Sequence, residues 1–254
     1  EAARIASERG HDVVLFEKGG QLGGNVIPGS QPPFKHDDKT LIEWFSGEMT
    51  RHNVDVKLNT AADKASIESE KPDSVIFATG SRPTQPNWLE GKDKPHVLVA
   101  ENMLMNPELI TGDKACVIGA GLVGAEAALW MAQQGKAVTL VEASDDIIGG
   151  PHGTCFANYQ MLKELLAKEQ VNVLTSTRLE RITDTGVCLN IENSSVEMLS
   201  DHVVLALGYK AEDHLHEELA NQLDVDEVFN IGDSQKARTI MAAIWDGFEV
   251  GRTL

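Results

Sequence analysis

The hydrophobic pattern is clearest in the middle of the chain, where two apolar strands flank an apolar helix. The first strand runs into Gly119 and a glycine-rich turn. Apolar residues then recur at helical spacing over about 123–134, and Gly135 is a helix stop signal. A second strand is expected at 137–141, directly before Glu142. The pattern predicts a strand–turn–helix–strand unit of the parallel α/β class.

The N-terminal residues repeat the second half of this unit. A helix is predicted over 1–9, Gly10 ends it, and a strand over 11–16 runs into Glu17. Because a unit of this kind starts with a strand and a glycine loop, we expect both to lie before residue 1. The chain is then a fragment of a longer polypeptide. An incidental helix that precedes a strand is the alternative interpretation.

Further apolar segments complete the predicted set of elements. Residues 38–52 have the pattern of an amphipathic helix, and a second long helix is predicted at about 237–252. In that second helix Trp245 and Phe248 fit a packed face. Buried-type strands that end in glycine are expected at 74–80 and 203–208, and short strands are expected at 54–57 and 228–233.

The glycines of the central turn are spaced as a dinucleotide requires. Gly119 permits a tight turn, Gly121 lets the backbone approach a pyrophosphate, and Gly124 lets helix and strand pack closely. The helix then starts at Leu122 and Val123, whose backbone N–H groups face the phosphates. Three glycines alone occur by chance in apolar sequence. Here the strand, turn, helix and second strand all stand in the required order, which favours nucleotide binding.

Glu142 supplies the acid that completes this pattern. It follows Gly119 by roughly 20 residues, the offset at which a carboxylate accepts hydrogen bonds from the adenosine ribose. No arginine or lysine lies within 143–150 to receive a 2′-phosphate. We therefore expect NADH to be preferred to NADPH.

Composition and charge narrow the class of protein. A length of 254 residues favours two domains. A net charge of −17 argues against binding to nucleic acid or to an anionic membrane surface. The longest apolar run, 115–132, contains Glu126 and three glycines, so we do not interpret it as a membrane span. No signal peptide opens the chain, and a cytoplasmic location is expected.

The cysteines and histidines do not predict a disulfide, a redox pair or a metal site. Cys116, Cys155 and Cys188 are too far apart for a disulfide framework, a zinc site or a redox pair, and we expect ordinary buried or half-buried thiols. His214 and His216 could share one face of a strand as metal ligands. Without a third ligand nearby, a solvated loop is the better interpretation, and no metal site is predicted.

Taken together, the motifs resemble those of a known family. The chain is similar to the C-terminal nucleotide-binding region of the NADH:flavin oxidoreductases of the 2,4-dienoyl-CoA reductase, 2-enoate reductase and trimethylamine dehydrogenase type. The similarity extends over essentially the whole chain, and the order of the motifs is more specific than any one of them. The motifs are Glu17 with the glycines of 19–24, the strand end 78–80, the fingerprint 119–124 with Glu142, and 231–233.

This resemblance implies two Rossmann-like lobes, with an NAD lobe inserted into an FAD lobe. Residues 1–100 and 213–254 would form the FAD lobe, which would lack its first strand and glycine loop. Residues 101–212 would form the NAD(H) lobe. The two cofactors implied for this region are FAD and NADH.

The resemblance also implies roles for individual residues. Glu17 would hold the FAD adenosine ribose, and the loop that starts at Lys18 would border the cofactor. Asp233 would bind the ribityl or pyrophosphate region, and the NADH site would be formed by the central fingerprint and Glu142. The other residues that the resemblance places next to a cofactor are Gly23, Gly24, Thr79, Gly80, Gly208, Gly232, Thr239 and Ile240.

The implied function is the electron-input half of a flavin-dependent oxidoreductase. Hydride would pass from NADH to FAD, and electrons would continue to an N-terminal barrel domain with FMN and an iron–sulfur cluster, which this sequence does not include. That barrel and the nucleotide cofactors are the expected partners, and an oligomer is possible. The alternative is a structural module that holds ADP without redox turnover. We expect the fragment by itself to bind FAD weakly and to be incapable of full turnover.

Overall fold

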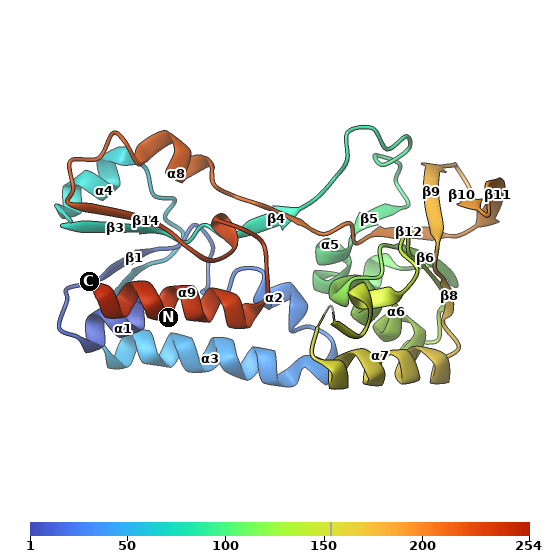
Figure 1. Ribbon diagram of the computed structural model, residues 1–254, viewed down its shortest axis with the longest axis horizontal. Coiled ribbons are helices and arrows are strands. Elements are labelled where there is room, and N and C mark those ends of the chain that lie inside the picture. The colour runs from blue at the N-terminus through green and yellow to red at the C-terminus, as the bar shows by residue number, and fades with distance from the viewer. Residues whose placement is uncertain (153) are drawn as a thin grey trace. The chain divides into compact units, whose positions relative to one another are not determined.

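The computed structural model describes residues 1–152 and 154–254 and divides into two compact units (Figure 1). Unit 1 comprises residues 1–30, 35–82 and 209–254. Unit 2 comprises residues 31–34 and 83–208. Both contain parallel strands with helices, which confirms the predicted Rossmann-like α/β class.

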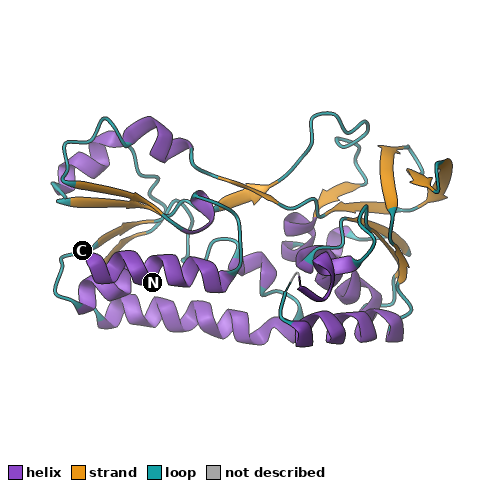
Figure 2. Ribbon diagram, viewed as in Figure 1, coloured by secondary structure: helices purple, strands orange, loops and turns teal. Residues whose placement is uncertain are grey.

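Unit 2 is built on a five-stranded parallel sheet in the order β5-β12-β6-β7-β8 (Figure 2). The central strands β6 and β7 and the helix between them lie within a residue or two of the predicted ranges. The strands of the sheet are β5 (Val97–Val99), β6 (Lys114–Ile118), β7 (Ala137–Val141), β8 (Asn172–Leu174) and β12 (His202–Leu205). The helices of unit 2 are α5 (Ala100–Met105), η2 (Pro107–Leu109), α6 (Leu122–Gln133), η3 (Ile147–His152) and α7 (Phe156–Lys168).

Both faces of this sheet are covered. Ala115 and Val117 of β6 pack with α5, α6 and α7 in one hydrophobic cluster. Cys116 and Ile118 point to the opposite face and pack against β9 and β10, two strands of a separate antiparallel sheet. Burial on both faces explains why β6 reads as a continuous apolar run and not as an alternating one. That antiparallel sheet consists of β9 (Thr177–Ile182), β10 (Gly186–Ile191) and β11 (Ser194–Leu199).

Unit 1 contains two separate parallel pairs of strands, β1 with β2 and β3 with β14. Figure 1 shows α4 and α8 above these strands and α1, α3 and α9 below them. The strands are β1 (Val14–Phe16), β2 (Asp55–Lys57), β3 (Ser74–Phe77) and β14 (Glu227–Asn230), together with the pair β4 (Ser81–Pro83) and β13 (Tyr209–Ala211). The helices are α1 (Ala2–Glu8), α2 (Val26–Gly29), η1 (Pro33–Lys35), α3 (His36–Arg51), α4 (Lys64–Glu70), α8 (His214–Leu219), η4 (Gly232–Ser234) and α9 (Ile240–Thr253).

The first and last helices of unit 1 pack together through two glycines of α9. A Cβ atom at Gly251 would lie 2.8 Å from the carbonyl oxygen of Ala2, and one at Gly247 would lie 3.0 Å from the Ala2 nitrogen. This close approach turns another face of α9 outward. Trp245 and Phe248, predicted to pack, are therefore 62% and 41% exposed.

The unit boundaries fall at 82/83 and 208/209, whereas the sequence predicts lobe boundaries at 100/101 and 212/213. Strand β5 explains the first difference, because it pairs with β12 inside unit 2. The segment before β5 also contacts unit 2, because its Glu90 carbonyl accepts a hydrogen bond from the Ile182 N–H of β9 at 2.9 Å. Unit 2 thus starts earlier than the NAD(H) lobe that the resemblance implies.

Other predictions also need correction. His214 and His216 lie in helix α8, not in a loop, and the His216 ring packs edge-on against Phe77 at 5.5 Å. No group of three metal-ligating side chains occurs among the described residues. Cys155 is exposed, whereas Cys116 and Cys188 are buried. Within residues 1–152 and 154–254, no helix is both long and apolar enough to cross a membrane.

Burial of His202, at the start of β12, makes unit 2 sensitive to acid. The Nδ1 atom of His202 and the Nε2 atom of His96 are buried without a hydrogen-bond partner among the described residues. The His202 Nε2 atom lies 3.3 Å from both the nitrogen and the hydroxyl of Thr111. Burial lowers the pKa of His202, although the neighbouring Asp201 opposes this effect. The folded protein therefore favours the neutral ring.

We expect the free energy of unfolding to fall as the pH drops below about 6.5, the ordinary histidine pKa. In this range the unfolded state binds more protons at His202 than the folded state does, so acid favours unfolding. Urea denaturation at pH 7.5 and 5.5 measures the effect. His202→Gln should reduce the loss, whereas His11→Gln, at an exposed position, should not. An unchanged pH dependence in His202→Gln contradicts this assignment.

Candidate nucleotide-binding sites

The glycine loop of unit 2 uses its three glycines for different reasons. Gly119 has a φ of +96°, and a Cβ atom there would lie 2.3 Å from the Ala206 carbonyl oxygen. A Cβ atom at Gly124 would lie 1.9 Å from the Gly119 carbonyl oxygen. Both positions exclude a side chain because backbone passes there. At Gly121 a Cβ atom would meet no atom within 4 Å, so this glycine leaves open space beside the helix.

That open space lies at the N-terminus of α6. Gly121 is the N-cap, with an extended backbone and no side-chain cap. Leu122 and Val123, both half-buried, form the first turn. The N–H groups of a first turn have no acceptor within the helix, and the helix dipole adds partial positive charge. The geometry therefore fits a pyrophosphate.

The carboxylate of Glu142 lies against this loop. Its Oε2 atom accepts a hydrogen bond from the Ala120 N–H at 2.8 Å, and its Oε1 atom accepts one from the Ser144 N–H at 2.9 Å. The following segment returns to the same place, because the Ile148 N–H donates to the Ala120 carbonyl at 2.7 Å. Glu142 is thus fixed beside the glycine loop, where a ribose that follows the pyrophosphate would lie.

In unit 1 the acid at the end of β1 orders its own loop. The Oε1 atom of Glu17 accepts the Gly19 N–H at 2.5 Å, and the Glu17 N–H donates to the Lys57 carbonyl at 3.0 Å. Gly23 has a φ of +131°, and a Cβ atom there would lie 2.9 Å from the Ile27 side chain. Gly24 also has a positive φ, and the neighbouring space is open.

A chain of polar contacts brings three predicted motifs of unit 1 together. The Asn25 side-chain amide donates to the carbonyl and the hydroxyl of Ser81, at 2.8 Å and 3.0 Å. The Ser81 hydroxyl in turn donates to Asp233 Oδ2 at 2.8 Å. The glycine loop after β1, the end of β3 and the turn before α9 therefore meet at one place. Asn25 and Ser81 carry no periodic or motif signal that would reveal this from the sequence.

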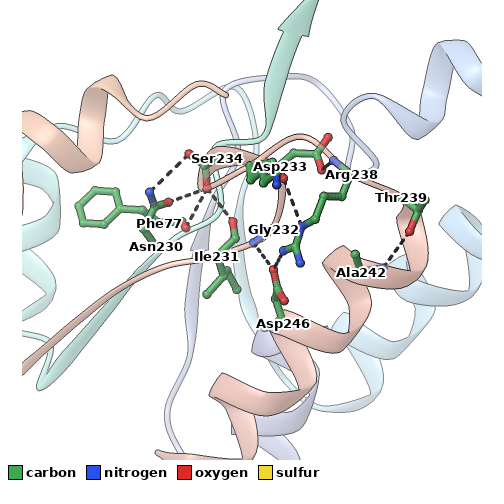
Figure 3. A network of polar contacts seen from close by, with 11 residues as sticks. Phe77, Asn230, Ile231, Gly232, Asp233, Ser234, Arg238, Thr239, Ala242 and Asp246 are labelled. Atoms are coloured by element: carbon green, nitrogen blue, oxygen red, sulfur yellow. Dashed lines mark hydrogen bonds and ion pairs between the residues drawn. The ribbon is translucent and has the colours of Figure 1, made fainter. Parts of the chain in front are cut away.

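The turn before α9 is held by a compact polar network (Figure 3). The fully buried hydroxyl of Ser234 lies 2.6 Å from the Ile231 carbonyl and 2.7 Å from Asn230 Oδ1. Asp246 of α9 accepts the Gly232 N–H at 3.0 Å and pairs with the Arg238 guanidinium. These contacts fix the turn that presents Asp233.

Asp233 and the start of α9 are positioned by the same turn. Asp233 Oδ1 accepts the Arg238 N–H at 2.9 Å. The Thr239 hydroxyl caps α9 by accepting the Ala242 N–H at 3.3 Å, so the helix starts at Ile240 and not at the predicted residue 237. The start of α9 is thus fixed next to Asp233, and Ile240 is partly exposed there.

The remaining predicted residues are distributed between the units. In unit 1 the Thr79 hydroxyl donates to the Glu212 carbonyl, and the Gly80 carbonyl accepts the Glu212 N–H at 2.9 Å. Lys18 is exposed. Gly208 belongs to unit 2, where its carbonyl accepts the Thr84 N–H at 2.9 Å.

The cysteines do not form a redox centre. All three are free, and they lie in β6, before α7 and in β10. Burial raises the pKa of Cys116 to about 12, which keeps this thiol protonated at neutral pH. Electron transfer through a dithiol is therefore not a chemistry that these residues support.

Two α/β units with acid-terminated strands and a glycine loop at a helix N-terminus are typical of a dinucleotide-binding protein. The chain belongs to the pyridine nucleotide-disulphide oxidoreductase family, whose profile matches residues 1–247. Membership in this family implies binding of FAD and NAD(P)H. The open space beside Gly121 and the hydrogen-bonded carboxylates of Glu142 and Glu17 fit these cofactors.

Individual reductases are similar to this chain. The chain is 43% identical to cinnamate reductase from Clostridium sporogenes and 36% identical to bilirubin reductase from Mediterraneibacter gnavus. In both comparisons all of this chain is matched, but only 37% and 39% of the relative. A solved 2-naphthoyl-CoA reductase superposes with a TM-score of 0.91 at 31% identity, over all of this chain and 38% of that one.

These comparisons confirm the predicted resemblance to reductases of the dienoyl-CoA reductase and trimethylamine dehydrogenase type. They also confirm the prediction of an oxidoreductase related to flavoprotein reductases. The chain spans less than two-fifths of the length of these two curated relatives.

Proposed function

We propose that this chain is the nucleotide-binding, electron-input region of a flavin-dependent reductase. Unit 2 binds NADH and unit 1 binds FAD. The observation that carries the proposal is the glycine loop of unit 2, open at Gly121 and joined to Glu142 through the 2.8 Å contact with the Ala120 N–H. This is the arrangement that a pyrophosphate and an adjoining ribose require.

The residues of this chain bind and orient the cofactors. Glu142 accepts a hydrogen bond from a ribose hydroxyl of NADH, and the first turn of α6 holds the pyrophosphate. In unit 1 Glu17 accepts a hydrogen bond from the adenosine ribose of FAD. The residues that border the FAD are Gly23, Gly24, Thr79 and Gly80. The remaining FAD contacts come from the turn that precedes α9 and from its first residues, namely Gly232, Asp233, Thr239 and Ile240. Gly208 is also assigned to cofactor binding.

Hydride transfer itself is chemistry that the bound nicotinamide and flavin supply. The contribution of the protein is position and charge. Electrons then pass to a catalytic barrel domain, for which the greater length of the relatives leaves room. We infer that this barrel carries FMN and an iron–sulfur cluster.

A glycine substitution tests the nucleotide site. Gly121→Val fills the open space and should weaken NADH binding at least about tenfold, because its side chain occupies the place of a phosphate. The free energy of unfolding should change by no more than about 1 kcal/mol, since a Cβ atom at this position meets no protein atom within 4 Å. NADH fluorescence gives the dissociation constant and urea denaturation gives the stability.

The exposed Gly47 of α3 provides the matched control. A Cβ atom there also meets no neighbour, and the residue lies in unit 1, so Gly47→Val should leave NADH binding unchanged. If the unaltered chain binds no NADH at millimolar concentration, the proposed function of unit 2 is wrong. Mass spectrometry of nucleotide released from the longer reductase separates FAD from ADP, and ADP alone would indicate a structural module.

A further inference from the structure

Three side chains beside the proposed NADH site form a cluster that the predicted motifs do not include. The Tyr159 hydroxyl donates to Asp146 Oδ2, and the Lys163 ammonium lies 2.9 Å from that hydroxyl and 3.3 Å from Asp146 Oδ1. The ammonium also lies 4.9 Å from the centre of the Tyr159 ring. Tyr159 is buried, whereas Lys163 is 45% exposed at its side chain. The cluster joins helix α7 to the segment after β7.

That segment is the one that carries the proposed ribose acceptor. It begins at Glu142 and returns at Ile148, and both ends contact Ala120 of the glycine loop. Asp146 lies between these two contacts and also accepts the Ile147 N–H at 2.8 Å. Ile148 has a φ of +59°, which is strained for a β-branched residue, so its conformation depends on the contacts around it. Asp146 supplies such a contact.

The charged side chains of this segment are all negative. Glu142, Asp145 and Asp146 lie within it, and Lys163 is the sole lysine or arginine in the sequence from 137 to 167. Lys163 is paired: the Tyr159 hydroxyl, followed by Asp146, raises its pKa. The same hydroxyl, with the Ile147 N–H and Lys163, lowers the pKa of Asp146. The pair therefore stays ionised at neutral pH, and each charge is directed at the other.

We propose that Asp146 is a specificity-determining residue that favours NADH over NADPH by holding Lys163 in this cluster. A 2′-phosphate adds a dianion that needs a cation, whereas a 2′-hydroxyl needs only the Glu142 carboxylate. A lysine released from Asp146 is free to move on a flexible side chain, and Asp146 belongs to the segment that begins at Glu142. The inference rests on the proposed NADH site, and it adds a residue that holds Lys163 in place beside the segment that follows Glu142.

Dissociation constants of NADH and NADPH, measured with the full 254-residue chain, test this assignment. Asp146→Asn keeps the shape of the side chain but releases Lys163, and the ratio of the NADPH constant to the NADH constant should fall about fivefold. Asp145→Asn is the matched control, because it removes the same charge from an exposed neighbour without releasing Lys163. Its ratio should change less than about twofold.

The double variant Asp146→Asn/Lys163→Met isolates the cation. It should return the ratio to that of Asp145→Asn, because the released charge is gone. Equal ratios in Asp146→Asn and Asp145→Asn, or a low ratio that persists in the double variant, overturn the inference. A wild-type chain that binds NADH and NADPH equally also overturns it and leaves the proposed function intact. A chain that binds neither nucleotide refutes the proposed function itself.

Lys163→Met alone keeps the test decisive if Asp146→Asn does not fold. A lysine held by Asp146 makes no contact with the nucleotide, so the wild-type ratio should persist. A rise in the ratio of more than about fivefold would show that Lys163 already binds the 2′-phosphate, and the assignment would be wrong. Lys168→Met, at the end of the same helix, controls for the loss of positive charge from α7.

Discussion

Replacing Gly124 with valine is expected to lower the free energy of unfolding by about 3 kcal/mol or more and to abolish NADH binding. A Cβ atom at this position would lie 1.9 Å from the carbonyl oxygen of Gly119 and 3.1 Å from Ala206 Cβ. The first of these atoms is backbone and cannot rotate away. Helix α6 would have to move from β6, and the glycine loop would move with it.

Urea denaturation followed by circular dichroism measures the stability, and NADH fluorescence measures binding. The comparison with Gly121→Val is informative because the two glycines belong to one loop. Gly121→Val should lose binding and keep stability, whereas Gly124→Val should lose both. A Gly124→Val protein as stable as the wild type would contradict the close packing of α6 on the loop.

The sequence predicts much of unit 2 because its signals are local. The apolar strand, the glycines and Glu142 lie within one short stretch, and each has a backbone reason to be there. The cluster of Asp146, Tyr159 and Lys163 was not predicted. Its members belong to a turn and to a separate helix, and their contact depends on how α7 docks, which periodicity does not report.

In unit 1 the sequence predicts the motifs singly and does not predict the contacts between them. The sequence places glycines after Glu17 and an acid at Asp233, yet it does not show that Asn25 and Ser81 link the two regions. Such links depend on single polar side chains in loops. The early boundary of unit 2 was missed for a similar reason, since the pairing of β5 with β12 joins residues far apart in the sequence.

FAD binding is expected to depend on one more strand in unit 1. Among the described residues, β1 pairs only with β2 and β14 only with β3, so the parallel strands form two separate pairs. Each pair presents an edge whose N–H and C=O groups have no ladder partner. A parallel strand between β1 and β3 would pair with one edge of each pair, as β6 lies between β7 and β12 in unit 2. A glycine loop after it would add the phosphate-binding turn that unit 2 has and unit 1 does not show in its described part.

A polypeptide that carries such a strand and loop upstream of α1 should therefore retain about one FAD per chain, whereas residues 1–254 alone should bind FAD weakly. Flavin absorbance relative to protein after gel filtration measures the difference. NADH binding is the internal control, and it should be equal in both proteins because unit 2 has its own sheet. In the longer polypeptide Asp233→Asn should lower FAD retention, since its carboxylate is held by Ser81 and the Arg238 N–H toward the site. Stoichiometric FAD on residues 1–254 would show that the two strand pairs already form a complete site.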